Sequence, residues 1–437
     1  MKTLVRIDVA SETSSVLSVA YQLGEMNSMR GKRFYGWYVV AAAHVLLMLI
    51  FGAAYSFGAF FSQIQSNFDA GRFSVASVFS LTAFLYYLVG VFSGSFADRF
   101  STRGVVVTGI LFLAAGFLFS SFATHSLHTF LAIFCLFVGL GVGLVYVPTV
   151  TTVQRWFIVR RSTASGIALA GTGLGTFIGP NVAGVLMEFV SWQSTMRIFA
   201  VAIALFGVIA AMVLHATPKS LGLHPDGVEQ TNTRAIPLSS KGMDLREASG
   251  TARFWWYFGA ILMGSVGLFL ALVHINPFAR EMGISGTEAN LLIGFVGAGN
   301  VGGRLFLGGV GDKIGPKRLL VWLTFSLAVL NGLWLGSAGF VSLAIFAVLF
   351  GAANGGCISL YPSVAANWFG TKNLGAILGA LYIGVGIAAV AGGSIAGLLF
   401  DTYHNYAASI MLSAVCALVS VLFIVCAERS APAAIAA

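Results

Sequence analysis

Long apolar runs separated by short polar segments fill most of the chain after residue 33. Each run has about 20 residues, which is enough for a helix to cross the roughly 30 Å hydrocarbon core of a bilayer. The runs are continuously apolar rather than alternating, so they exclude a β-barrel, and single strands in lipid would leave their amides unsatisfied. The pattern predicts an all-α membrane protein with twelve spans, at residues 37–62, 74–95, 104–123, 128–153, 163–187, 195–215, 254–277, 288–309, 319–338, 341–366, 374–398 and 407–427.

Composition agrees with this pattern and excludes a water-soluble globule. Of the 437 residues, 58% are hydrophobic and only 9% are charged, against roughly 25% charged in ordinary soluble domains. The first 33 residues are polar and contain no apolar run, so we expect a tail and no cleavable signal peptide. The four cysteines fall in apolar runs without metal-ligand spacing, and the sequence has no P-loop and no paired carboxylates. We therefore expect no metal site, no cofactor, no ATP-driven transport and no enzyme activity.

The basic residues are distributed asymmetrically over the predicted topology. If the N-terminus is inside, 20 of the 24 Lys and Arg residues are cytoplasmic, Arg72, Arg197 and Arg280 are outside, and Arg304 lies within a span. This is the positive-inside pattern. It predicts an integral plasma (inner) membrane protein with both termini in the cytoplasm, and it attributes the net charge of +9 to membrane insertion and anionic lipid, not to a nucleic-acid partner.

A hydrophilic stretch at residues 216–252 divides the spans into two sets of six, and the two sets repeat each other. Landmarks of the first half recur 213 or 214 positions later, among them Pro148 as Pro362 and Gly166 as Gly379. Duplicated six-helix units in a membrane are the architecture of alternating-access carriers. We expect these parts: an N-terminal tail 1–33, a six-helix bundle 34–215, a cytoplasmic linker 216–252 with at most one surface helix, a second bundle 253–427, and a C-terminal tail 428–437.

Two loops of matching sequence join the second span to the third and the eighth to the ninth. Each has a glycine, an acidic residue four positions later, and then basic residues. The acidic residue can cap the next helix or pair with a basic residue across the seam between the halves. Charge pairs that are made in one global state and lost in the other would form a breakable latch. The expected gating residues are Asp98, Arg99 and Arg103 in the first loop and Asp312, Lys313, Lys317 and Arg318 in the second.

The second of these loops, from Gly308 to Arg318, resembles the signature loop of the major facilitator superfamily. The first loop is similar but has Ser101 where the second glycine is usual, and Gly175-x3-Gly179-Pro180 resembles that superfamily's antiporter-type motif. Three more stretches are similar to the monocarboxylate transporter and oxalate:formate antiporter group: Phe34-Tyr-Gly-Trp37, Gln154-Arg-Trp-Phe157 with the following Arg160 to Gly166, and Gly299-Asn300-Val-Gly-Gly-Arg304. The resemblance covers about residues 34–427 and implies a carrier with two six-helix halves.

Arg304 is the one charged residue expected inside a span away from its ends, because all 15 Asp and Glu residues fall in tails, loops or helix ends. It precedes Asp312 by eight residues, so it lies roughly 12 Å from the loop. Burying arginine in hydrocarbon costs at least about 2.5–3.5 kcal/mol, and its charge cannot be removed at accessible pH. We expect it to face a water-filled cavity and to bind an anion reversibly. The alternatives are snorkelling to the interface and a permanent bond to a backbone carbonyl.

The neighbours of Arg304 support a binding site. Asn300 lies one turn earlier on the same helical face, and the glycines at 297, 299, 302 and 303 leave room for a ligand. The resemblance implies that Arg304 binds the substrate carboxylate. It also implies that the residue at position 300 is often an aspartate that takes part in proton coupling, and that oxalate carriers add a lysine in the eleventh span. Neither is present here, which favours a monoanion such as lactate, pyruvate, formate or acetate over oxalate.

Several aromatic residues and one histidine complete the candidate site. Tyrosines in spans one, four, ten and eleven can donate phenolic hydroxyls to a carboxylate and pack against its alkyl tail. His44, about one third into the first span, is either a proton acceptor or a hydrogen-bonded packing residue. The candidate substrate residues are Arg304, Asn300, Tyr55, Tyr146, Tyr361 and Tyr382, with His44 as the candidate for proton coupling.

Together these features predict a secondary carrier that moves a small monocarboxylate across the membrane, with a proton or in exchange for another anion. Three alternatives stay open: an oxalate/formate-type dicarboxylate antiporter, a non-transporting receptor that senses a carboxylate, and a carrier for an unrelated solute such as a sugar. The absence of carboxylates from the middle of the spans argues against cationic drugs as cargo.

Overall fold

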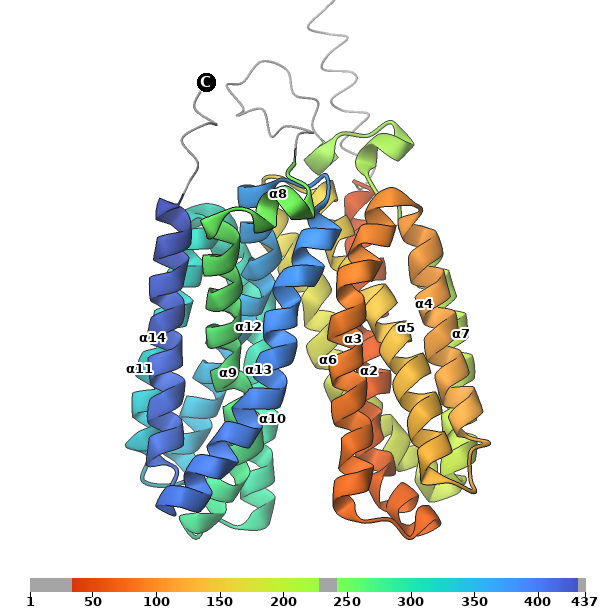
Figure 1. The fold of residues 1–437 in the computed structure, drawn as a ribbon, viewed down its shortest axis with the longest axis vertical. Coiled ribbons are helices and arrows are strands. Elements are labelled where there is room, and N and C mark those ends of the chain that lie inside the picture. The colour runs from red at the N-terminus through yellow and green to blue at the C-terminus, as the bar shows by residue number, and fades with distance from the viewer. Residues whose placement is uncertain (1–33, 228–241, 431–437) are drawn as a thin grey trace, which may run out of the picture.

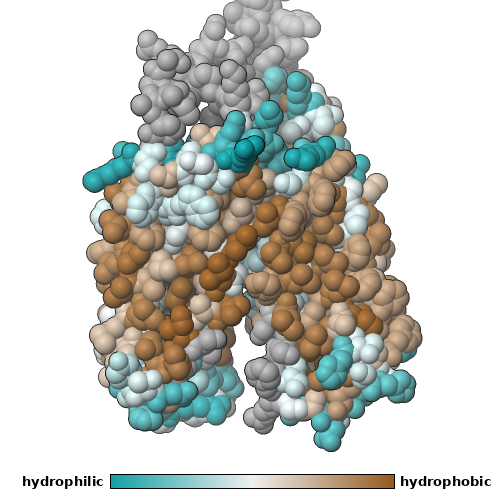
Figure 2. Space-filling model, in the orientation of Figure 1, coloured by the Kyte–Doolittle hydropathy of each residue, from teal (hydrophilic) through white to brown (hydrophobic). Residues whose placement is uncertain are grey.

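The computed structural model describes residues 34–227 and 242–430. In these ranges the chain forms twelve helices that are long and apolar enough to cross a membrane, as the hydropathy pattern predicts. On the face shown in Figure 2, an apolar band covers the middle of the molecule between hydrophilic ends. The N-terminal half contains α2 Gly36–Phe68, α3 Arg72–Arg99, α4 Thr102–Ser120, α5 Leu127–Trp156, α6 Arg161–Phe189 and α7 Trp192–Val213; the C-terminal half contains α9 Ala252–Glu281, α10 Gly286–Ile314, α11 Pro316–Leu335, α12 Phe340–Phe369, α13 Leu374–Tyr403 and α14 Ala407–Arg429.

Most helices extend a few residues beyond the predicted spans, because local caps and not hydropathy set their ends. Side chains of Ser126, Ser191 and Thr251 accept hydrogen bonds from the first turns of α5, α7 and α9. Ser285 and Glu288 form a capping box at the start of α10. Such caps satisfy amides that have no partner within the helix. Polar residues therefore continue several helices past the apolar run that the sequence displays.

The unusual Ser101 in the first signature loop has a structural explanation. Its backbone is extended, and its hydroxyl accepts a hydrogen bond from the Gly104 amide at the start of α4. The matching residue of the second loop, Gly315, has a φ of +95° and is followed by Pro316 at the first position of α11. A positive φ favours glycine, and proline suits the first helical position. The two loops thus turn the chain at the same place by different local chemistry.

The two six-helix halves meet closely at one end and separate toward the other (Figure 1). The meeting end is the one that carries the short helix α8 Leu245–Ser249, and we call it the linker side. Across the seam, α3 packs against α13 and α6 packs against α10. These two pairs occupy equivalent positions in the repeat, so the contact between the halves follows the internal symmetry.

The linker joins both halves on this side. Its first part holds two short 3₁₀ turns, Pro218–Leu221 and Pro225–Gly227. The carboxylate of Asp226 accepts hydrogen bonds from the amides of residues 158 and 159 between α5 and α6, at 2.8 and 2.9 Å. Its last part contacts the C-terminal half, where the Met243 amide donates to the Phe369 carbonyl at 3.0 Å. The helix α8 is the one α-helix in the described residues of this stretch.

Candidate functional site

A central cavity of about 670 Å³ lies between the two halves. It opens at the end opposite the linker side. The space-filling view shows the cleft between the halves at that end (Figure 2). Helices of both halves line it, with α2, α3, α5 and α6 on one wall and α9, α10, α12 and α13 on the other. All six residues expected to bind substrate are among its lining residues: Tyr55, Tyr146, Asn300, Arg304, Tyr361 and Tyr382.

Arg304 is 7% exposed and lines this cavity from α10. Its Nη1 donates to the carbonyl of Leu169 at 2.6 Å and to the hydroxyl of Thr172, both in α6. Its Nε has no hydrogen-bond partner among the described residues. Neither ion pair found in the described part of the chain involves it. The guanidinium thus makes the carbonyl contact foreseen as an alternative, but its charge has no counterion there and part of its donor set is unused.

The surroundings of Arg304 are neutral as well as polar. Tyr146, Tyr382, Tyr55 and Tyr87 are within electrostatic reach of the guanidinium. Phenols are neutral at physiological pH, so these groups can solvate the cation without neutralising it. The described cavity lining contains no Asp, Glu, Lys or His. An anion that entered would therefore meet one full positive charge.

Asn300 lies on the cavity wall one turn from Arg304 and is 8% exposed. Its amide Nδ2 donates to Oδ1 of Asn354 in α12 at 3.2 Å. The two amides thus form a polar pair beside the guanidinium. Asn354 was not predicted from the sequence, although a buried amide within an apolar span was a usable signal.

The glycines near Arg304 serve different purposes, which corrects the expectation that all four make room for a ligand. Gly299 and Gly303 face the backbone of α12, where an added Cβ would lie 2.2 and 2.0 Å from the carbonyl oxygens of Val348 and Ala352. They permit close helix packing. Gly297 lines the cavity with open space around it. Gly302 also has open space around it but is not among the cavity-lining residues.

The tyrosines form a row of rings that crosses the seam. Tyr146 of the N-terminal half stacks on Tyr382 of the C-terminal half, with ring centroids 5.5 Å apart and planes 27° apart. The ring of Phe51 meets that of Tyr146 edge to face, with centroids 5.4 Å apart. It stacks on the ring of Tyr55, with centroids 6.2 Å apart. These separations are typical of favourable aromatic pairs. The row therefore joins the two walls of the cavity through side chains alone.

His44 is in α2 but is not among the cavity-lining residues. Its Nδ1 lies 2.7 Å from the carbonyl of Ile167 in α6. A carbonyl can only accept, so Nδ1 must carry the hydrogen. This contact ties α2 to α6, and a role of His44 in proton coupling stays a prediction.

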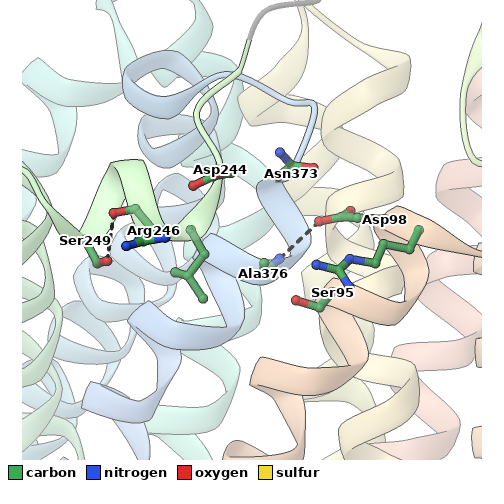
Figure 3. Close-up of a pocket in the computed structure, with 9 residues that line it drawn as sticks. Ser95, Asp98, Asp244, Arg246, Ser249, Asn373 and Ala376 are labelled. Carbon is green, nitrogen blue, oxygen red and sulfur yellow. Dashed lines mark hydrogen bonds between the residues drawn. The ribbon is translucent and has the colours of Figure 1, made fainter.

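On the linker side, Asp98 connects the halves. It forms an ion pair with Arg155 at the end of α5, and the two side chains are 3% and 9% exposed. Its Oδ2 also accepts from the Ala376 amide in the first turn of α13, at 3.2 Å (Figure 3). Arg155 in turn donates to the carbonyl of Thr371 at 3.2 Å, just before α13. An acidic group near a helix N-terminus is favoured by the helix dipole.

Asp312 makes the symmetry-related connection. Its carboxylate accepts from the amides of Ser162 and Thr163 at 2.8 and 2.9 Å, and from the Thr163 hydroxyl at 2.6 Å. These donors belong to the first turn of α6, in the opposite half. Each signature acid therefore caps a helix of the other half and not the next helix in sequence. We call these two connections, with Arg155, the linker-side latch.

The basic residues of the signature loops have other surroundings. Arg103 donates to the Leu214 carbonyl at 3.2 Å, within the N-terminal half. Lys317 pairs with Glu428 at the end of α14, within the C-terminal half. Arg99 lies at the surface near Asp98, lining a second, smaller pocket of about 500 Å³. No contact of the Lys313 or Arg318 side chain is found among the described hydrogen bonds and ion pairs. A gating role for these basic residues stays a prediction.

Sequence reasoning missed Arg155, Thr172, Asn354 and Tyr87. Arg155 was counted only as a cytoplasmic charge, although it lies in the stretch that carries the family resemblance. Thr172 and Tyr87 carry no charge and no unusual spacing, so only their position in the folded bundle shows that they face the cavity.

Solved structures share this fold. The chain aligns with the fucose transporter FucP, described as a crystal structure in the outward conformation, with a TM-score of 0.66 and 14% identity, covering 89% of this chain and 98% of that one. The proton:xylose symporter XylE bound to 6-bromo-6-deoxy-D-glucose gives a TM-score of 0.71 at 14% identity, with 89% and 95% covered. At this level of identity the likeness establishes the twelve-helix architecture.

Sequence relatives include proteins named monocarboxylate transporters. Monocarboxylate transporter 13 of Bos taurus is 26% identical over 382 residues, covering 87% of this chain and 86% of the relative. Monocarboxylate transporter 11 of Homo sapiens is 27% identical over 395 residues, covering 87% and 80%. The family model of the Major Facilitator Superfamily matches residues 43–333 and 260–436. The chain is a membrane transporter and not an enzyme, and it belongs to the major facilitator superfamily.

Proposed function

We propose that this secondary transporter carries small monocarboxylates of the lactate and pyruvate type. The observation that carries the proposal is Arg304, a buried cation on the cavity wall without a counterion among the described residues. A carboxylate can accept parallel hydrogen bonds from a guanidinium, and it supplies the charge that the site lacks. The sequence relatives named monocarboxylate transporters support the same substrate class.

Charge matching favours a monoanion. The described cavity lining offers one full positive charge, so a doubly charged oxalate would bring one negative charge that has no partner. Burying an unpaired charge costs several kcal/mol. Asn300 and Asn354 provide neutral donors for the carboxylate or for a neighbouring oxo or hydroxyl group. An oxalate/formate-type exchange of dicarboxylates is therefore the weaker alternative.

The latch and the cavity support a transport cycle with two states. We place the linker side in the cytoplasm, in accord with the positive-inside pattern, so the described state is open to the outside. Substrate binding would neutralise Arg304 and lower the cost of closing the cavity around it. The latch of Asp98, Arg155 and Asp312 then has to break for release to the cytoplasm. The rings of Tyr146 and Tyr382 would separate in the same step, because they belong to different halves.

Proton symport and anion exchange both fit a single fixed cation. The two modes are separated by the pH of the lumen of reconstituted vesicles. Symport acidifies the lumen during lactate uptake, whereas exchange of one monoanion for another leaves lumenal pH unchanged and requires anion inside the vesicle.

The test of the proposed function is uptake of radiolabelled lactate and pyruvate into proteoliposomes. Arg304→Ala should abolish uptake, and Arg304→Lys should keep a small fraction, because lysine keeps the charge but lacks the planar fork. Arg280→Ala is the matched control, since this arginine is exposed at the end of α9 and outside the cavity lining. Size-exclusion chromatography checks that each variant is folded. Uptake by folded Arg304→Ala at the wild-type rate would contradict the proposal, and binding without uptake by the wild type would indicate a receptor.

A further inference from the structure

The cavity lining is mostly apolar and carries one charge. Among the 25 described residues that line it, one is charged and eight are aromatic. Thr172 and Arg304 are hydrogen-bonded to each other, and Asn300 lies one turn from Arg304 and bonds to Asn354, so these polar groups form one cluster. The hydroxyl of Thr176 is used by its own helix, where it donates to the Gly173 carbonyl at 2.8 Å. The one charge of the lining and its two amides thus lie together, and the other polar groups of the lining are Ser265 and the tyrosine hydroxyls.

The cavity of the described state is larger than a two- or three-carbon acid. At about 30 Å³ of liquid volume per water molecule, a cavity of about 670 Å³ corresponds to roughly twenty waters. Pyruvate has only six non-hydrogen atoms. Bound at Arg304, it would fill a small part of a cavity whose lining also includes the apolar side chains of Phe51, Phe177, Leu268 and Phe269.

We propose that the preferred substrates are monocarboxylates with an aromatic ring or a comparably bulky apolar tail. This inference rests on the proposed function, because it takes Arg304 as the carboxylate site. Tyr146, Tyr382 and Tyr55 are within electrostatic reach of the guanidinium. With Phe51 they form a row of contacting rings that lines the cavity. A substrate ring attached a few bonds from the carboxylate meets this row at separations that favour edge-to-face and offset contacts.

Burial of the apolar tail distinguishes acids that share the same carboxylate head. Removal of apolar surface from water stabilises a complex in proportion to the area buried, and ring contacts add to this. A carboxylate head common to two acids contributes equally to both. The acid with the ring should therefore bind more tightly, in proportion to the tail that the cavity encloses.

Pyruvate and phenylpyruvate form a matched pair of probes, because they share the α-keto acid head and differ by the phenyl group. We expect phenylpyruvate uptake by the wild-type protein to show a KM at least about tenfold below that of pyruvate, and phenylpyruvate to compete with labelled pyruvate; tenfold corresponds to about 1.4 kcal/mol. A KM for phenylpyruvate equal to or higher than that for pyruvate would overturn the inference. The proposed function would still stand if pyruvate were taken up. Uptake of neither acid by the folded protein would overturn both.

Variants of two glycines test where the ring lies. Gly297 lines the cavity with open space beside it, so Gly297→Leu should place its side chain in the apolar part and lower the phenylpyruvate-to-pyruvate ratio of kcat/KM at least about tenfold. Gly302→Leu adds the same side chain to the same helix outside the cavity lining and should leave that ratio unchanged. A ratio that stayed at the wild-type value in Gly297→Leu, or fell equally in both variants, would contradict a ring site in this cavity.

Discussion

Gly166 in α6 faces the backbone carbonyl of Arg304 in α10, so closely that a Cβ at Gly166 would lie 2.0 Å from that oxygen. The same helix crossing continues at Gly308, which faces the Ser162 carbonyl. The guanidinium of Arg304 also bonds across this crossing, to Leu169 and Thr172 of α6. Opening of the linker side must separate α6 from α10, so the residue proposed to bind substrate lies on an element that moves in gating. Binding and gating are thereby physically connected.

Alanine at the crossing glycines should destabilise the described state. Gly94 forms the equivalent α3–α13 crossing, where a Cβ would lie 2.0 Å from the Gly375 carbonyl. Overpacking of this kind typically costs about 1–3 kcal/mol, and it acts only on the state in which the helices touch. We therefore expect Gly94→Ala and Gly166→Ala to increase the population that is open on the linker side and to slow transport.

This shift can be measured by double electron–electron resonance spectroscopy between spin labels at two exposed positions on the linker side. They are Lys219, in the part of the linker that follows α7, and Arg429, at the end of α14. Longer distances in Gly94→Ala and Gly166→Ala than in the wild type are expected. Gly302→Ala is the control, because its Cβ would meet nothing within 4 Å. Unchanged distances in both crossing variants would show that the glycines are not needed for closure.

Neutralising the latch acids should open the linker side, with a larger effect at Asp98. Asp98→Asn leaves the guanidinium of Arg155 buried without a counterion, and breaking a buried ion pair costs about 3–5 kcal/mol. Asp312→Asn retains an oxygen that can accept from the first turn of α6, so we expect a loss of only about 1–3 kcal/mol.

The same spin-label distances report this effect, and Arg155→Gln combined with Asp98→Asn should restore part of the closed population. Lys317→Gln is the control, because its pair with Glu428 is partly exposed and stays within one half; it should change the distances little. An Asp98→Asn distance distribution like that of Lys317→Gln would refute the latch.

The fold could be predicted from the sequence because lipid leaves few alternatives. Continuous apolar runs must be helices in a bilayer, and the repeat of Gly166 as Gly379 and of Asp98 as Asp312 sets the two halves. Helix ends were less predictable. The extension of α2 to Phe68 and of α13 to Tyr403 includes polar residues that hydropathy alone leaves in loops.

The site was predictable where a charge or a bulky ring marked it and not elsewhere. The desolvation cost of Arg304 identified it without any knowledge of its neighbours. It was harder to predict which face of α10 lies toward the cavity. Glycines occur on several of its faces, and no apolar stripe separates the lipid side from the cavity side. For this reason the different roles of Gly299 and Gly302 emerged only from the packing of α10 against α12. Partners from distant segments, such as Thr172 for Arg304, leave no local signal.

Asn300→Asp should make uptake depend on pH. The new carboxylate would lie one turn from Arg304 and, when ionised, would compete with the substrate for the guanidinium. Protonation removes this competition, so pyruvate uptake by the variant should rise from pH 7.5 to pH 5.5 more steeply than uptake by the wild type. Asn300→Leu, which removes the amide without adding a titratable group, is the matched control and should lose affinity with the wild-type pH profile. A pH profile of Asn300→Asp identical to that of Asn300→Leu would show that position 300 does not interact with the bound carboxylate.

His44→Gln should reduce stability more than it changes coupling. The observed Nδ1 contact to the Ile167 carbonyl ties α2 to α6, and a hydrogen bond of this kind contributes about 0.5–1.5 kcal/mol. Because His44 is not among the cavity-lining residues, we expect lactate uptake with the wild-type pH profile and a lower thermal unfolding temperature in detergent. Glutamine can donate to the same carbonyl and should therefore be less destabilising than His44→Ala. Loss of substrate-driven acidification in vesicles, with exchange of labelled lactate preserved in His44→Gln, would instead assign the proton-coupling role to this histidine.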